Sequence, residues 1–177
     1  DQIKTNLLDI KVDKRLIKIF DKITHSSVRV YLSIKLVELQ TGVEYIEFTL
    51  EEMSKLSGNS EKTIRRDLKD LESNSFVIKG TRSNNKGRKN TYKINHYGSR
   101  KYGYTKLSKS LTQLMINELA PGEMVLYILM YSKSLGLNNI TVFTSQEKLA
   151  AEIGTERTPS SVSIITDKLH KKNFIFK

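Results

Sequence analysis

The chain of 177 residues is long enough for one large domain or two small ones, and its 38% hydrophobic and 28% charged residues are ordinary for a globular protein. The absence of cysteine excludes disulfides, thiolate metal sites and thiol catalysis. The net charge of +11 indicates a polyanionic partner, and residues 62–101 alone hold 12 basic and 3 acidic residues.

Hydropathy gives no sign of a targeting or membrane segment. The first 20 residues lack a long apolar run and a cleavage site of small residues, so no signal peptide is expected. The longest apolar run, residues 124–131, is too short to span a bilayer. We therefore expect a cytoplasmic protein without a membrane partner.

In chain order, the pattern first predicts a helix over 26–40 and an alternating strand over 43–48. A second helix begins at Thr49, which forms a capping box with Glu52, and ends at Gly58. A third helix follows over 60–73 with Ser60 as its N-cap. Strands over 76–79 and 91–95 enclose a polar, basic loop.

A glycine-containing stretch over 98–105 is expected to be a linker, and a similar series follows it. Helices are predicted over 121–135, from Thr144 with Glu147 to Gly154, and over 159–172 with Thr158 as N-cap. Short β-like runs lie at 140–143 and 174–177. The pairs "FTLEEMSKLSG"/"FTSQEKLAAEIG" and "NSFVIK"/"KNFIFK" occur in the same order, which indicates a duplicated unit.

The order helix, strand, helix, turn, helix, hairpin resembles the winged helix-turn-helix fold. The resemblance implies a mainly α protein with small β-hairpin wings (α+β) and two tandem winged-helix domains. Residues 1–97 would form the first domain, with an N-terminal extension and a basic wing, and residues 106–177 the second, whose wing is incomplete at Lys177.

The helix after Gly58 has one apolar and one basic side. At about 100° per residue, Ile64, Leu68 and Leu71 fall together and face the core. A helix of this kind fits the major groove of B-DNA, N-terminus first. Contacts with duplex DNA are therefore expected from one set of residues: Asn59, Ser60, Lys62, Thr63, Arg65, Arg66 and Lys69. The alternative is an exposed helix face whose cations are simply solvated.

The basic loop between the strands over 76–79 and 91–95 favours DNA binding over simple solvation, because solubility does not require so many cations in one loop. A hairpin tip carrying arginine fits a minor groove, most readily an A+T-rich one. The wing contacts are expected from Arg82, Lys86, Arg88, Lys89 and Asn90.

The corresponding helix of the second unit gives a weaker signal, because Ile164 and Asp167 fall on the side that would meet DNA. Ile164 would contact a thymine methyl or a protein partner. The remaining expected DNA contacts are Arg157, Thr158, Ser160, Ser161, Ser163 and Lys171.

No catalytic or metal-binding motif accompanies these features. The three histidines are scattered, and "GNSEKT" lacks the ending of a phosphate-binding loop. We expect no enzyme, no metal and no cofactor. The second unit is similar to helix-turn-helix units of plasmid and phage replication proteins. That resemblance implies a bacterial initiator, associated with the nucleoid or a plasmid, that binds double-stranded DNA at an origin, alone or as a homodimer or multimer. The alternatives are a transcriptional repressor of a mobile element and a winged-helix scaffold for protein interaction.

Overall fold

A long buried helix, α3 (His25–Thr41), organises the molecule. Apart from the partly exposed Arg29, every residue from Ser27 to Leu36 is buried, so other elements pack on all sides of this helix. The structure is a computed structural model that describes residues 9–81, 89–136, 142, 144–154 and 159–176. The described chain is mainly helical, with small antiparallel sheets, as expected for an α+β protein.

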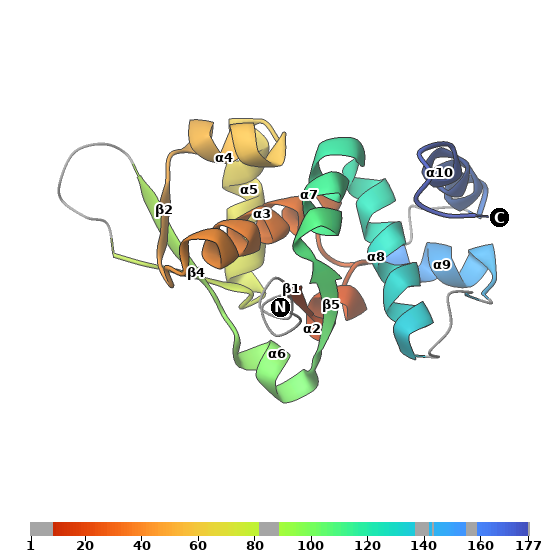
Figure 1. Cartoon of the computed structure of the whole chain (residues 1–177), viewed down its shortest axis with the longest axis horizontal. Helices are drawn as coiled ribbons and strands as arrows, with labels where there is room; N and C mark the ends of the chain where they lie inside the picture. The colour runs from red at the N-terminus through yellow and green to blue at the C-terminus, as the bar shows by residue number, and fades with distance from the viewer. Residues whose placement is uncertain (1–8, 82–88, 137–141, 143, 155–158, 177) are drawn as a thin grey trace, which may run out of the picture.

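One side of α3 carries the elements predicted for the first unit. The strand β2 (Ile46–Phe48), the helices α4 (Leu50–Ser57) and α5 (Glu61–Ser73), and the strands β3 (Val77–Lys79) and β4 (Asn90–Ile94) follow it in that order. The three strands form an antiparallel sheet in the order β2-β4-β3. Both α4 and α5 pack against α3. The sheet extends away from them to one end of the molecule (Figure 1).

The turn between α4 and α5 is built as its local sequence predicts. The Thr49 side chain accepts from the backbone N–H of Glu52, and Glu52 accepts from that of Thr49, which completes the capping box. Gly58 ends α4 with φ of 74°, a left-handed conformation that glycine adopts without steric cost. The Ser60 hydroxyl then caps α5 by accepting from the N–H of Thr63 at 3.3 Å.

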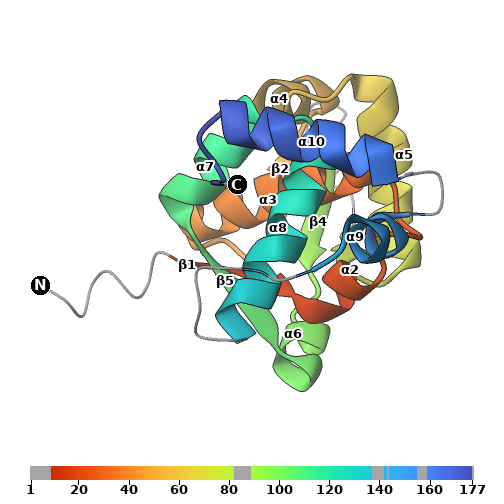
Figure 2. The same ribbon diagram turned by 90° about the vertical axis from the view of Figure 1, so that its right-hand side faces the viewer.

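The other side of α3 carries the helices α7 (Lys109–Glu118) and α8 (Pro121–Gly136). The helices α9 (Gln146–Ile153) and α10 (Pro159–Lys171) in turn pack on α8. Figure 2 shows α8 near the viewer, with α10 crossing above it and α9 beside it. The N-cap of α9 is Ser145, one residue after the predicted Thr144, and Thr158 lies outside the described residues. Neither residue 142 nor 174–176 forms a strand.

The segment expected to be a linker is folded. Residues 97–102 form the helix α6 (Tyr97–Tyr102), and residues 104–108 form the strand β5 (Tyr104–Ser108). This strand pairs antiparallel with β1 (Asp9–Asp13), with Ile10 opposite Leu107. A short helix, α2 (Lys14–Lys18), follows β1 and contacts α6. Residues 98–105 are therefore not a linker: they belong to α6 and β5, which pack against β1 and α2.

A single hydrophobic core connects these elements. It runs from Val12 and Phe20 through Val28 and Leu68 to Leu126, without a break between the two halves. No helix in the described ranges is both long enough and apolar enough to cross a membrane.

Candidate nucleic-acid interface

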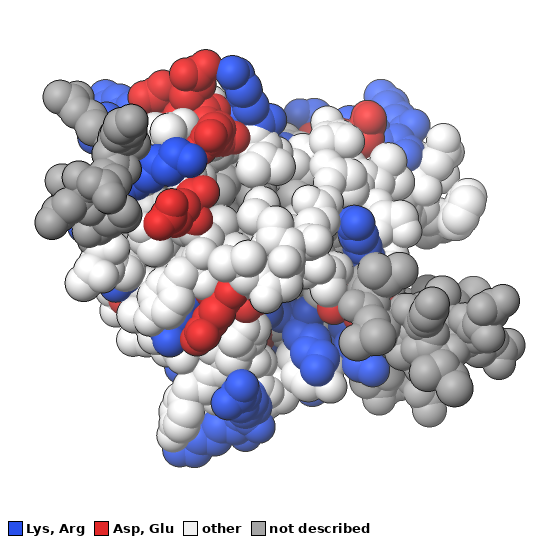
Figure 3. All heavy atoms as spheres, turned by 60° about the vertical axis from the view of Figure 1, so that its left-hand side comes forward, with Lys and Arg blue, Asp and Glu red and all other residues white. Residues whose placement is uncertain are grey.

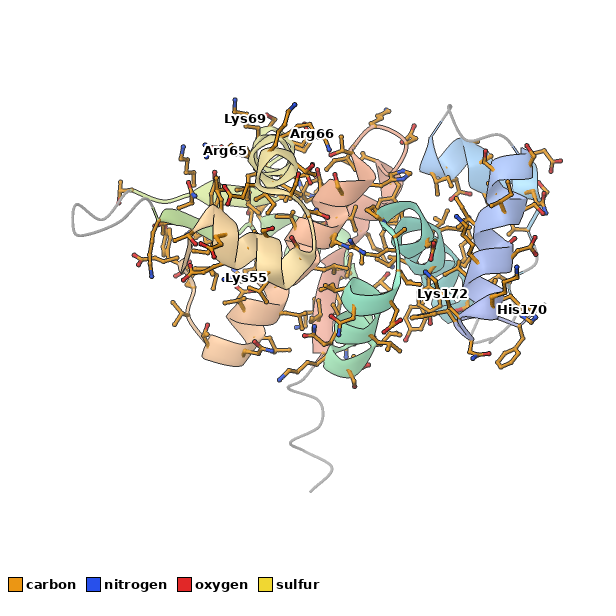
Figure 4. The ribbon with its side chains drawn as sticks, turned by 90° about the horizontal axis from the view of Figure 1, so that it is seen from above. Lys55, Arg65, Arg66, Lys69, His170 and Lys172 are labelled. Carbon is orange, nitrogen blue, oxygen red and sulfur yellow. The ribbon has the colours of Figure 1, made fainter. Side chains whose placement is uncertain are left out.

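The helix α5 presents a basic outer side because its sequence has a strong helical period. Ile64, Leu68 and Leu71 are buried against α3, as the periodicity predicts. Lys62, Arg65 and Lys69 are exposed. No carboxylate in the described part of the chain forms an ion pair with these three residues. Figure 4 shows Arg65 and Lys69 on the outer side of α5.

Arg66 differs from its neighbours because the protein holds one edge of its guanidinium. Its guanidinium Nη2 lies 3.3 Å from Oδ1 of Asp67 and donates to the Ser26 hydroxyl at 3.0 Å. The side chain of Arg66 is still 58% exposed, whereas that of Asp67 is fully buried. One edge of Arg66 is thus fixed by the protein, which leaves the rest of the guanidinium available to a ligand.

Asp67 is the centre of this polar cluster. Ser26 Oγ donates to its Oδ1 at 2.9 Å, and the Asn59 side-chain amide lies 3.4 Å from its Oδ2. The same amide donates to the backbone carbonyl of Ser26 at 3.1 Å. The cluster therefore joins the start of α3 to the turn before α5, and it fixes the angle at which α5 leaves that turn.

These contacts show that Asn59, predicted to contact DNA, is instead used inside the protein. Asn59 is only 7% exposed, and its side-chain amide is used inside the protein. Asp67 was not among the predicted site residues, although a helical wheel places it at about 300° from Ile64, next to Leu71 on the inner side. That position is the signal by which the sequence could have identified it.

The structure places the other predicted residues of the first unit at different exposures. Ser60 is exposed and donates to the Thr63 hydroxyl at 2.9 Å, and Thr63 is half-buried. Lys89 is exposed just before β4, whose first residue, Asn90, is half-buried. Lys79 at the end of β3 is also exposed and adds a cation that the sequence reasoning missed. The wing residues Arg82, Lys86 and Arg88 lie outside the described residues.

A hollow of about 500 Å³ lies beside Arg66, between the two halves. The start of α3 lines it with Thr24, His25 and Ser26, and the end of α9 lines it with Ile153 and Gly154. His25 Nε2 lies 2.7 Å from the carbonyl oxygen of Ile153, so one imidazole bridges the two halves. The charged residues of the lining are Asp21 and Lys22, just before α3, and Arg66 on α5.

The helix α10 has less charge on its outer side. Val162 and Leu169 are buried and Ile164 is 56% exposed, as its periodicity predicts. Ser160 and Lys171 are exposed, while Ser161 and Ser163 are half-buried. Arg157 and Thr158 lie outside the described residues. Both α5 and α10 are at the surface, with α3 and α8 between them (Figure 1).

No three potential metal ligands cluster among the residues that the structure describes. The candidate site therefore consists of the three exposed cations of α5 and the anchored Arg66.

No family model matches this chain, and neither the search of curated proteins nor that of solved structures found a match.

Proposed function

We propose that residues 25–94 form a winged helix-turn-helix unit that binds double-stranded DNA, with α5 in the major groove. The observation that carries this proposal is the outer side of α5, where Lys62, Arg65 and Lys69 are exposed among the described residues. An α-helix fits this groove, and arginine donates two parallel hydrogen bonds to guanine. The anchored guanidinium of Arg66 is suited to a backbone phosphate, since phosphate contacts fix the register of a helix on the duplex.

We further propose that α9 and α10 form a second helix-turn-helix, so that the chain holds two tandem units. Ser160 and Lys171 on α10 would contact the backbone, and Ile164 would contact a thymine methyl. Because one core holds both helices, their spacing would be fixed before binding. Such a chain would suit the two major grooves of a site of roughly two helical turns.

The biological role that we propose is the recognition of a plasmid or phage replication origin. Its support is the resemblance of "TVFTSQEKLAAEIG" to units of replication proteins, together with the basic surface of α5. Selection of bound fragments from the DNA of the host replicon tests this role. Enrichment of repeats at an origin supports it, whereas enrichment of promoter fragments would identify a transcriptional regulator instead.

Duplex binding itself is tested by fluorescence anisotropy with a labelled duplex over a range of salt concentrations. Affinity should fall steeply with salt, with a slope near −0.9 for each neutralised phosphate. Arg65→Ala should lower the affinity by about 1–3 kcal/mol and relax sequence preference, while Lys69→Ala should weaken all duplexes alike.

The control is Lys133→Ala, which removes a cation from α8, where Lys133 pairs with Glu152 at 2.8 Å. It should leave duplex affinity within about twofold of the parent, the scatter expected for a charge remote from the interface. A flat salt dependence, or equal losses in the α5 and α8 variants, would contradict binding through α5.

A further inference from the structure

A second surface with nucleic-acid chemistry lies around α6. It combines exposed tyrosines and cations from α6 with residues of the β1–β5 sheet, and we call it the α6 face: Tyr97, Arg100, Lys101, Tyr102, Lys11 and Tyr104. Figure 1 shows α6 at the lower end of the molecule, whereas α4 is at the upper end. Figure 3 shows one group of Lys and Arg spheres at this lower end, and others at the upper end beside those of Asp and Glu.

The tyrosines of α6 are unusually exposed for their size. Tyr97 is 60% and Tyr102 50% exposed. The ammonium of Lys101 lies 5.7 Å from the ring centroid of Tyr97 and 5.2 Å from that of Tyr102. Hydrogen bonding to Tyr102, and next to Tyr97, raises the pKa of Lys101, so the cation between the two rings stays charged. Two aromatic faces and one cation are thus presented to solvent together.

A partly buried ion pair between Arg15 and Asp13 supports this arrangement. Arg15 donates from Nη2 to Oδ2 of Asp13 at 2.9 Å, and Asp13 is 1% exposed. The guanidinium carbon of Arg15 lies 5.7 Å from the ring centroid of Tyr102. A Cβ at Gly98 would come within 2.0 Å of Nη2 of Arg15, so only glycine lets the guanidinium lie across α6. The ring of Tyr102 therefore rests on a fixed support.

A hollow of about 240 Å³ lies between α6 and the β1–β5 sheet, beside Tyr104. Lys11, His96, Ser99, Arg100 and Tyr104 line it, and the Lys11 ammonium lies 4.9 Å from the Tyr104 ring centroid. His96 already pairs with Glu38 at 2.7 Å, which leaves Lys11 and Arg100 as the cations of the lining. In β1, α2, α6 and β5 the only acidic residues are Asp9 and Asp13. The basic residues of these elements outnumber them, and they are Lys11, Lys14, Arg15, Lys18, Arg100, Lys101 and Lys106.

We propose that the α6 face binds single-stranded nucleic acid. Proteins that bind single strands combine a positively charged groove, which follows the backbone, with aromatic side chains on which bases stack. Here Tyr97 and Tyr102 would stack on unpaired bases, and Lys11 and Arg100 in the hollow would hold phosphates. A duplex would not use these rings, because its bases are already stacked within the helix. This surface does not depend on duplex binding by α5.

The test measures anisotropy of labelled 12-residue oligothymidine and oligouridine. Tyr97→Ala and Tyr102→Ala should each weaken binding about tenfold, the effect expected for the loss of one base-stacking ring. Tyr97→Phe and Tyr102→Phe keep the ring and should retain affinity within about twofold of the parent. A preference for oligothymidine identifies DNA as the ligand, and a preference for oligouridine identifies RNA.

The matched control is Tyr45→Ala. Tyr45 is 43% exposed, and its ring lies 4.8 Å from the Lys93 ammonium, but both residues are outside the α6 face. It should bind both oligomers like the parent, as should Arg65→Ala and Lys69→Ala. Unchanged affinity in the folded Tyr97→Ala and Tyr102→Ala variants, or a loss confined to the α5 variants, would overturn the proposal. Duplex affinity in the same α5 variants tests the proposed function separately.

Discussion

At the scale of single residues, the charges that are buried matter most for stability, and the exposed charges matter for binding. Asp67 and Lys35 are 0% and 4% exposed, respectively. A buried charge requires hydrogen-bonding partners or a shifted pKa, because its transfer out of water is costly. Asp67 meets this requirement through Ser26, Asn59 and Arg66, and Lys35 meets it by a lowered pKa.

We predict that Asp67→Asn lowers the free energy of unfolding by about 1–3 kcal/mol, since the amide cannot satisfy all the donors that surround it. Arg66 would also lose its anchoring carboxylate, so duplex affinity should fall. Urea unfolding and anisotropy measure the two effects. Glu72→Gln on the exposed side of α5 is the control, with an expected change within about 0.5 kcal/mol. Equal unfolding midpoints for the two variants would show that the cluster is not stabilising.

Lys35 leads to a pH-dependent prediction. Burial lowers its pKa from 10.5 to about 8, while Glu38 acts in the opposite direction. Between these two values the unfolded chain binds more protons at Lys35, so its contribution makes stability rise with pH across this window. Below pH 8 both states are protonated, and burial of the charge costs up to about 3 kcal/mol.

Lys35→Met should therefore raise the free energy of unfolding by about 1–3 kcal/mol at pH 7 and remove this rise between pH 8 and 10.5. Urea unfolding at a series of pH values checks both outcomes. Lys55→Met is the control, because Lys55 is exposed on α4 and pairs with Glu51. A parent protein whose stability is flat over this window would contradict the burial of a charged Lys35.

At the scale of elements, features encoded locally could be predicted and features encoded by distant partners could not. The capping box at Thr49, the left-handed Gly58 and the apolar side of α5 all depend on residues within one or two turns. The strand β5 pairs with β1, about 95 residues earlier in the chain, and no local signal records such a partner. The local sequence of 98–105 therefore predicts a linker, where the structure has α6 and the start of β5.

The candidate site likewise combines residues placed by local periodicity with a residue placed by a distant partner. Helical periodicity correctly placed Lys62, Arg65 and Lys69 on the outer side of α5. It could not show that Asn59, in the turn, would bond to the start of α3. That contact joins residues 33 positions apart, and it depends on how α3 and α5 pack.

The turn between α4 and α5 provides a prediction about backbone conformation. Gly58→Ala should destabilise the protein by about 1–2 kcal/mol, because φ of 74° brings a Cβ close to the following carbonyl oxygen. The added Cβ would lie 3.6 Å from Nη1 of Arg29, which is ordinary contact, so conformation and not crowding sets the cost.

Two further variants check this interpretation in the same unfolding assay. Gly42 has φ of 67°, and a Cβ added there would have no neighbour within 4 Å. The loss of stability in Gly42→Ala should therefore match that in Gly58→Ala. Gly58→Asn should cost less than Gly58→Ala, because asparagine tolerates the left-handed region. A much larger loss for Gly58→Ala than for Gly42→Ala would show that packing against Arg29 dominates.

At the scale of the whole molecule, α3 makes the two halves interdependent. The elements of the first half pack on one side of it and α7 and α8 on the other. Polar contacts also cross the boundary, since Arg29 Nη2 donates to the Leu119 carbonyl and His25 bonds to that of Ile153. The two proposed nucleic-acid surfaces, α5 and the α6 face, would thus be held on one rigid framework rather than on two independent domains.

We predict that the chain unfolds in a single cooperative transition. Far-UV circular dichroism and tyrosine fluorescence should give the same urea midpoint, because loss of α3 removes the core of both halves. A chain that ends at residue 97 should be largely unfolded, since it lacks β5, α7 and α8 and exposes the apolar side of α3. Phe176→Ala, at a side chain that is 88% exposed, should leave the midpoint unchanged. Two separate transitions, or a stable 1–97 fragment, would show that each half folds alone.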